Sequence, residues 1–204
     1  MPASPERSTL FDLAGGHPAL DLVNSLDNRY REDGPHEMLA GLPELLRFLQ
    51  EVSLITPRQA HALNKNTDAS ATVQVLESVR ELREASAAVL YAAVAGETPP
   101  RVALQTLERY FLEAHRQRRL AWENGASWEW TASESDPRLT VWILAQSVWQ
   151  LLFSEQMTLI RTCDAHTCRW LFLDTSKNHT RRWCNMRVCG NRMKARRFQA
   201  RRGS

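Results

Sequence analysis

Three features are missing from this sequence, and each absence excludes a class of protein. The longest mostly apolar run, residues 139–153, contains four polar residues and is too short to span a bilayer. The first residues contain no apolar segment of the kind found in secretory signals. No cysteine occurs before position 163, which leaves no disulfide framework over most of the chain. We therefore expect neither a membrane protein nor a secreted one, and predict a cytoplasmic location.

Signatures of the common enzyme classes are absent as well. The chain contains no glycine-rich phosphate loop, no G-x-S-x-G and no H-E-x-x-H. Its six histidines are scattered, although His17 and His115 could meet in the fold. We predict that the protein is not an enzyme. Catalysis would require a deep pocket lined by His17, Asp21 or Asn24.

Charge is distributed very unevenly along the chain. Residues 161–204 contain twelve Lys and Arg against two acidic residues, a formal charge of +10. Residues 1–160 contain fourteen basic and twenty-one acidic side chains, a formal charge of −7. The overall value of +3 conceals this arrangement. A basic segment attached to an acidic one predicts a polyanionic partner for the basic segment.

Residues 1–160 carry mainly helical patterns. Pro18 suits the first position of a helix, and Thr56 followed by Pro57 marks the start of another. Apolar side chains such as Val75, Val79 and Leu82 recur at helical spacing. These signals predict helices at about 18–27, 41–52, 57–66, 70–94, 101–117 and 137–160.

One stretch follows a different pattern. Asn124-Gly125 lies between segments that carry Trp122 on one side and Trp128 and Trp130 on the other, which predicts a β-hairpin. We expect the tryptophans of the hairpin and of the last long helix to lie in the core. The predicted fold class is thus mainly α with a small β-hairpin. A helical N-terminal domain, residues 1–160 (the body), precedes a small C-terminal domain, residues 161–204, across a rigid junction.

All four cysteines lie within the C-terminal domain. Cys163 and Cys168 form one close pair and Cys184 and Cys189 a second, with fifteen residues between the pairs. Two close pairs at this separation are typical of a structural zinc site, because two turns together supply a tetrahedron of thiolates. Four sulfurs leave no position for water, so we expect structural and not catalytic Zn²⁺. Four buried cysteines or an iron–sulfur cluster are the alternatives. His166 and His179 lie nearby, and we expect them outside the ligand set.

Two motifs carry a resemblance to a known family. "SKNHTRRWCNMRVCGNRMKARR" resembles the CGNR zinc finger, whose tetrapeptide stands here as 189–192. "GGHPALDLVNSLDNR" resembles the start of the ABATE-type domain, which precedes this finger in bacterial stress-induced transcription regulators. The resemblance implies a zinc-binding finger that contacts DNA and a helical N-terminal domain of uncertain role. We call residues 161–204 the finger from here on.

The basic side chains of the finger are its predicted nucleic-acid contacts. They would neutralise phosphates, and arginine can also bind guanine edges. The resemblance favours DNA over RNA. The set comprises Lys177, Arg181, Arg182, Arg187, Arg192, Lys194, Arg196, Arg197, Arg201 and Arg202. Two alternatives stay open: the last helix is a solvated face, or it docks on the acidic body of the same or a second chain. We expect Met193 and Phe198 to pack this helix back on the finger.

A polar set surrounds the first predicted helix. His17, Asp21, Asn24, Asn28 and Arg29 lie close in sequence, and Asp21, Asn24 and Asn28 share one helical face. They form either a pocket for a small-molecule effector or a capping network that satisfies local backbone groups. The second is the commoner use of such residues, and we favour it.

Taken as a whole, the sequence predicts a bacterial, cytoplasmic transcription regulator. Its finger would bind DNA, and its body would sense a ligand or form a homodimer. The alternative is an interaction or scaffold module whose basic zinc element docks on an acidic partner or on its own body. DNA binding at low salt would distinguish the two.

Overall fold

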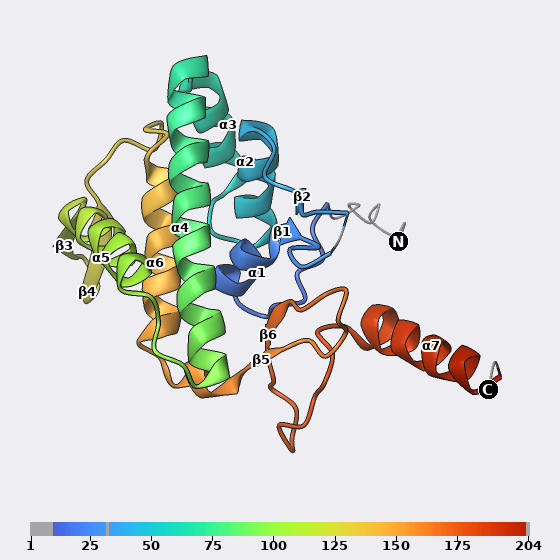
Figure 1. Cartoon of the computed structure of the whole chain (residues 1–204). Coiled ribbons are helices and arrows are strands. Elements are labelled where there is room, and N and C mark those ends of the chain that lie inside the picture. The colour runs from blue at the N-terminus through green and yellow to red at the C-terminus, as the bar shows by residue number, and fades with distance from the viewer. Residues whose placement is uncertain (1–9, 32, 203–204) are drawn as a thin grey trace, which may run out of the picture.

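The structure is a computed structural model that describes residues 10–31 and 33–202, apart from the side chains of Arg197, Arg201 and Arg202. A bundle of helices forms the body, and the finger lies at one end of it (Figure 1). The helices are α1 (Pro18–Asn24), α2 (Leu42–Glu51), α3 (Pro57–Asn66), α4 (Ala69–Ala95), α5 (Arg101–Arg116), α6 (Leu139–Leu152) and α7 (Asn191–Arg202). The strands are β1 (Leu26–Asp27), β2 (His36–Glu37), β3 (Arg118–Trp122), β4 (Ala126–Trp130), β5 (Ile160–Thr162) and β6 (Leu171–Leu173). The predicted fold class, mainly helical with small antiparallel strand pairs, is confirmed.

Local capping chemistry explains where several helices begin and end. The Thr56 hydroxyl accepts a hydrogen bond from the Gln59 amide at 3.2 Å, and the Gln59 side chain accepts one from the Thr56 amide at 2.9 Å. This reciprocal pair is a capping box, and α3 begins where the sequence predicts. Asp68 caps the start of α4. Gly96 follows its last residue, Ala95, with a φ of 73°, a left-handed conformation that glycine adopts without steric cost.

The core of the body surrounds α4, the longest helix. α4 packs against α1, α2, α5 and α6, and it runs beside α6 through the middle of the molecule (Figure 1). Phe48, Leu82, Leu90 and Trp142 are almost completely buried there. At roughly 1.5–3 kcal/mol for each large apolar side chain removed from water, this burial accounts for most of the stabilisation of the body.

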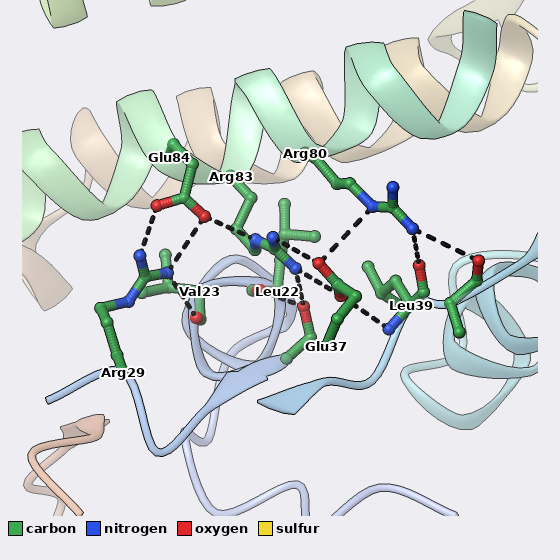
Figure 2. A network of polar contacts seen from close by, with 10 residues as sticks. Leu22, Val23, Arg29, Glu37, Leu39, Arg80, Arg83 and Glu84 are labelled. Carbon is green, nitrogen blue, oxygen red and sulfur yellow. Dashed lines mark hydrogen bonds and ion pairs between the residues drawn. The ribbon is translucent and has the colours of Figure 1, made fainter. Parts of the chain in front are cut away.

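A network of ion pairs and hydrogen bonds connects the β1–β2 segment to α4 (Figure 2). Arg83, only 3% exposed, donates to both carboxylate oxygens of Glu37 at 2.8 and 2.7 Å. It also donates to Glu84, which in turn pairs with Arg29. Desolvation opposes the charge of Arg83, but these carboxylates raise its pKa overall. The buried guanidinium is therefore fully paired, which a charge in an apolar core requires.

The predicted hairpin is present. β3 and β4 pair antiparallel with Leu120 opposite Trp128 and Trp122 opposite Ala126. The expectation that its tryptophans are core residues is wrong for two of them, because Trp122 is 76% and Trp128 is 58% exposed. Only Trp130, at the base of the hairpin, packs against the core of the body.

Two predicted helices end earlier than expected. α1 stops at Asn24, and the chain continues into β1, which pairs with β2. α6 stops at Leu152, where Ser154 donates to the Leu151 carbonyl, and a 3₁₀ helix (η1, Glu155–Leu159) follows. Ile160 then enters the core at 1% exposure, which a continuous helix to residue 160 would not allow.

The finger joins the body through the β5–β6 pair. Ile160 lies opposite Leu173, and Thr162 lies opposite Leu171. Ile160, Leu171 and Leu173 all belong to the apolar core of the body, not to that of the finger. After β6 the chain forms a loop, a π-helical turn (η2, Met186–Gly190) and α7, which projects away from the rest of the molecule (Figure 1). Among residues 10–31 and 33–202, no helix combines the length and apolar character needed to cross a bilayer.

Candidate metal centre and basic surface

The four cysteine sulfurs converge on one point of the finger. The Sγ atoms of Cys163, Cys168, Cys184 and Cys189 all lie within 4.8 Å of one another. Two of the separations are 3.6 Å, for Cys168 to Cys184, and 3.8 Å, for Cys184 to Cys189. A tetrahedral zinc ion with Zn–S bonds of about 2.3 Å places its sulfurs about 3.8 Å apart. The donor set and its spacing therefore fit Zn²⁺.

The chemistry of the sulfurs also suits a cation. Hydrogen bonds from Cys168 and Cys184 lower the pKa of Cys163, and donation to Cys163 raises the pKa of Cys184. Four thiols in so small a space cannot all ionise, because the resulting thiolates would repel one another unless a positive ion lay between them. A divalent metal supplies that charge, and soft sulfur ligands favour zinc among the divalent ions of the cell.

Backbone hydrogen bonds shape the two turns that present the sulfurs. In the first turn, the Cys163 amide donates to the Trp170 carbonyl at 2.8 Å, and the Cys168 amide donates to the Ala165 carbonyl at 2.7 Å. In the second, the Cys189 amide donates to the Asn185 carbonyl at 2.9 Å. The Asn185 side chain accepts from the Arg187 amide at 3.0 Å and caps the turn that leads into α7.

Asp174 organises the loop between the two cysteine pairs. One of its carboxylate oxygens accepts from the amide and the hydroxyl of Ser176, and the other accepts from the Arg181 amide at 2.8 Å. The Ser176 hydroxyl is the main reason that the pKa of Asp174 is lowered. His179 bonds the Asp174 carbonyl through Nδ1, and His166 is exposed, so neither histidine belongs to the sulfur cluster.

Four of the predicted nucleic-acid contacts bond within the finger. Arg181 donates to the carbonyls of Trp183 and Cys184, and Arg182 pairs with Asp164 at 2.6 Å. Arg192 donates to the Thr167 hydroxyl at 3.3 Å, and Arg196 lies 2.5 Å from His166 Nε2. Of the four, only Arg182 has its charge compensated by a carboxylate.

Three other predicted contacts point into solvent. Lys177, Arg187 and Lys194 are exposed, and their side chains have no partner among the described residues. The side chains of Arg197, Arg201 and Arg202 lie outside the described part of the chain. Met193 packs on the sulfur cluster as expected, but Phe198 is 61% exposed and does not bury itself against it.

The polar residues around α1 are engaged with the protein itself. The His17 ring accepts from the Ala19 amide at 3.1 Å, and burial lowers its pKa. Asp21 accepts from the Gly15 amide at 2.8 Å, and burial raises its pKa to about 7. Arg29 pairs with Glu84 and donates to the Val23 carbonyl (Figure 2).

Asn24 has a role that the sequence did not reveal. Its amide nitrogen donates to the Leu171 carbonyl at 2.9 Å, and its amide oxygen accepts from the Leu171 amide at 3.0 Å. Trp170 donates to Asp27 at 2.9 Å, and Tyr91 donates to the Arg169 carbonyl at 2.9 Å. Because these partners lie 78–147 positions apart in sequence, no local pattern could indicate them.

The two motifs from opposite ends of the chain meet at one cavity. Asn28 of the N-terminal motif and Arg192 of the CGNR tetrapeptide both line a cavity of about 260 Å³ between the body and the finger. Asp12, Asp27 and Trp170 line it as well. Asp21 and Asn24 border a separate space of about 10 Å³, which holds at most one water molecule.

The class of protein follows from these observations: a helical domain that carries a four-cysteine zinc finger with a projecting basic helix. Two family descriptions match the chain in the order given by its motifs. The ABATE domain, described as "Putative stress-induced transcription regulator", matches residues 16–155, and the CGNR zinc finger matches residues 160–202. The chain therefore belongs to the ABATE family and carries a CGNR zinc finger. No curated protein matches it.

Proposed function

We propose that this protein is a transcription regulator, not an enzyme, whose zinc-loaded finger binds DNA. The observation that carries the proposal is the position of α7. This basic helix begins two residues after the fourth cysteine and extends away from the body (Figure 1). A tetrahedral ion held by four sulfurs would fix its first turn, and it would do so structurally because no coordination position is open to a substrate.

The packing of α7 leaves surface for a charged partner. It contacts the η2 turn and Thr167 and His166 of the first cysteine turn, and it projects away from the acidic body (Figure 1). A helix of twelve residues is marginally stable in water unless it packs against another surface. A duplex provides that surface, together with phosphates for the cations.

The side chains best placed for phosphates are the three that point into solvent, Lys177, Arg187 and Lys194. Arg192 and Arg196 bond to Thr167 and His166 and not to a carboxylate, so they add to the same positive field. Arg182 contributes less to this positive field, because the carboxylate of Asp164 offsets its charge.

The test is duplex binding by fluorescence anisotropy over a series of salt concentrations, with zinc-loaded protein. The change is Arg187→Ala combined with Lys194→Ala. If both side chains contact phosphates, affinity falls and the slope of log K against log salt becomes shallower by about 2, since each contact contributes about 0.9.

The matched control removes the same charge from the body. Arg58 and Lys65 lie exposed on α3, so Arg58→Ala with Lys65→Ala changes the net charge equally while leaving the finger intact. This variant should bind as the wild type does. No binding of the wild type at low salt would refute the proposal and favour the alternative, in which the finger docks on an acidic protein.

The body would serve as the sensor of this regulator, and the cavity between body and finger is where we place the effector. Asp12 and Asp27 have no cationic partner among the described residues, and Arg192 has no anionic one there. A small zwitterion would match these charges. Free amino acids should then raise the melting temperature of the wild type but not that of Asp27→Asn; equal responses would refute this location.

A further inference from the structure

The apolar surface that remains uncovered is concentrated on two neighbouring elements of the body. One is a groove of about 650 Å³ between α5 and the end of α6. Leu104, Leu112 and Phe153 line it and are 45%, 51% and 74% exposed. The other is the β3–β4 hairpin, which begins two residues after α5 ends.

The large apolar side chains that the hairpin leaves exposed lie on one face. Leu120 and Trp128 are directly opposite each other, and Trp122 is two residues from Leu120, so all three point to the same side. Trp130 lies on that side too, and it packs against the core of the body. Arg118, on the same face, lies over the Trp128 and Trp130 rings, 5.4 and 5.3 Å from their centroids. Beyond Arg118 the face continues outward, where Leu120, Trp122 and Trp128 stay 58–76% exposed.

A hairpin of this kind needs a covering surface. Two strands alone are marginally stable in water, and here only the base of the hairpin is packed. Its three large side chains are 58–76% exposed, although each is costly to leave in water.

We propose that a second copy of this chain covers both elements, with the hairpin of each copy inserted in the α5–α6 groove of the other. The exposed face of the hairpin and the groove are both largely apolar and adjoin on the same chain. One two-fold axis can therefore place each hairpin in the groove of the other copy. The six exposed side chains present roughly 800 Å² of apolar surface per copy, which matches the area per partner of a standard stable interface. The inference is independent of DNA binding.

The first test is the molar mass of the full-length, zinc-loaded chain by sedimentation velocity at micromolar concentration. The wild type should have twice the mass of one chain. Trp122→Glu on the hairpin and Leu112→Glu in the groove should each be monomeric, because each places a charge in the apolar contact. Ser127→Glu is the matched control: Ser127 is exposed on the opposite face of the hairpin, and this variant should remain a dimer.

A mixing experiment tests whether the hairpin of each copy binds the groove of the other. A heterodimer of Trp122→Glu and Leu112→Glu has both changes in one of its two contacts, which leaves the other contact intact. Mixing the two monomeric variants should therefore restore dimers, at higher concentration than the wild type requires.

Three outcomes would overturn the proposal. They are a monomeric wild type at about 100 µM, dissociation of Ser127→Glu as complete as that of Trp122→Glu, and no dimer on mixing. Bound zinc and the circular dichroism of each variant confirm that loss of the dimer is not loss of the fold.

Discussion

The body and the finger are stabilised in different ways. In the body, long helices bury side chains such as Leu82, Leu90 and Trp142 almost completely. The finger has a cluster of its own in which Phe172 is the one large side chain that is completely buried, surrounded by cysteines. Ordering each residue costs about 1–2 kcal/mol, and one phenyl ring cannot offset that over such a loop. Within one chain, apolar area suffices for the first region, whereas the small apolar cluster and the four converging sulfurs of the second favour stabilisation by a metal.

The two regions are not fully separate, because part of the finger packs in the apolar core of the body. Leu171 and Leu173 of β6 pack with body residues, and the Leu173 amide donates to the Gly15 carbonyl at 2.9 Å. Gly15 also donates to Asp21, and a Cβ at this position would lie 2.6 Å from the Asp21 carboxylate. Only glycine lets this loop lie so close to α1, and the same loop carries the carbonyl that accepts from Leu173. The first part of the finger should therefore stay attached to the body when the sulfur cluster fails.

Cys184→Ser gives the largest expected effect. Removing one ligand of a structural zinc site forfeits much of a binding free energy on the order of 10 kcal/mol, so residues from the first cysteine turn through α7 should unfold. Hydrogen exchange should rise throughout this segment while α4 stays protected, and bound zinc should fall well below one per chain.

Leu82→Ala removes packing from the core of the body instead of a ligand from the finger, and it serves as the control for Cys184→Ser. It should lower the free energy of unfolding of the body by about 2–5 kcal/mol, yet leave zinc stoichiometric. If Cys184→Ser retained one zinc per chain, or if it exposed α4 as much as the loop, the contrast between the two regions would be wrong.

A smaller, pH-dependent effect concerns Asp21. Burial raises its pKa to about 7 from 3.8, so the folded protein favours the protonated carboxyl. That preference contributes stability below pH 3.8 and is lost as the pH rises through 7. Relative to Asp21→Asn, the wild type should lose about 3 kcal/mol of unfolding free energy between pH 5 and pH 8.

Urea denaturation of both proteins at several pH values provides the measurement. Effects of the thiolates on zinc binding are common to the two proteins and cancel in the difference. A difference that does not vary with pH would show that Asp21 ionises normally.

The smallest of the three effects concerns the junction. Asn24→Ala removes both bonds to Leu171 and leaves a buried amide and carbonyl without partners, which should cost about 2 kcal/mol. The Leu171 amide should exchange faster with solvent. Asn64→Ala, at an exposed position on α3, is the control and should change neither quantity. Unchanged exchange at Leu171 in Asn24→Ala would mean that apolar packing alone holds β6.

Features set by nearby residues could be predicted from the sequence. The Thr56 cap, the Asn124-Gly125 hairpin and the spacing of the cysteine pairs each depend on a few consecutive positions, and the structure has the corresponding helix, hairpin and sulfur cluster. The course of the chain after Leu152 depends instead on tertiary packing. Ile160 must reach the core, and helical periodicity cannot reveal that requirement.

Contacts between the ends of the chain were beyond prediction for a related reason. The polar pattern around α1 is consistent with local capping, which we favoured, and with a ligand pocket. Asn24 satisfies neither description, since its partner lies 147 residues away. Trp122 and Trp128 show a similar limit. Their alternation predicts the strand but does not say whether anything covers the face they share.

The pair of bonds between Asn24 and Leu171 involves only the main chain of the finger. Such an attachment is indifferent to side-chain identity, much as a further β-strand would be. Residues of the finger that face outward, away from Trp170, Leu171 and Leu173, could thus be exchanged without altering the angle at which the body holds it. For protein engineering, the ABATE domain could therefore hold variants of the finger in one common orientation.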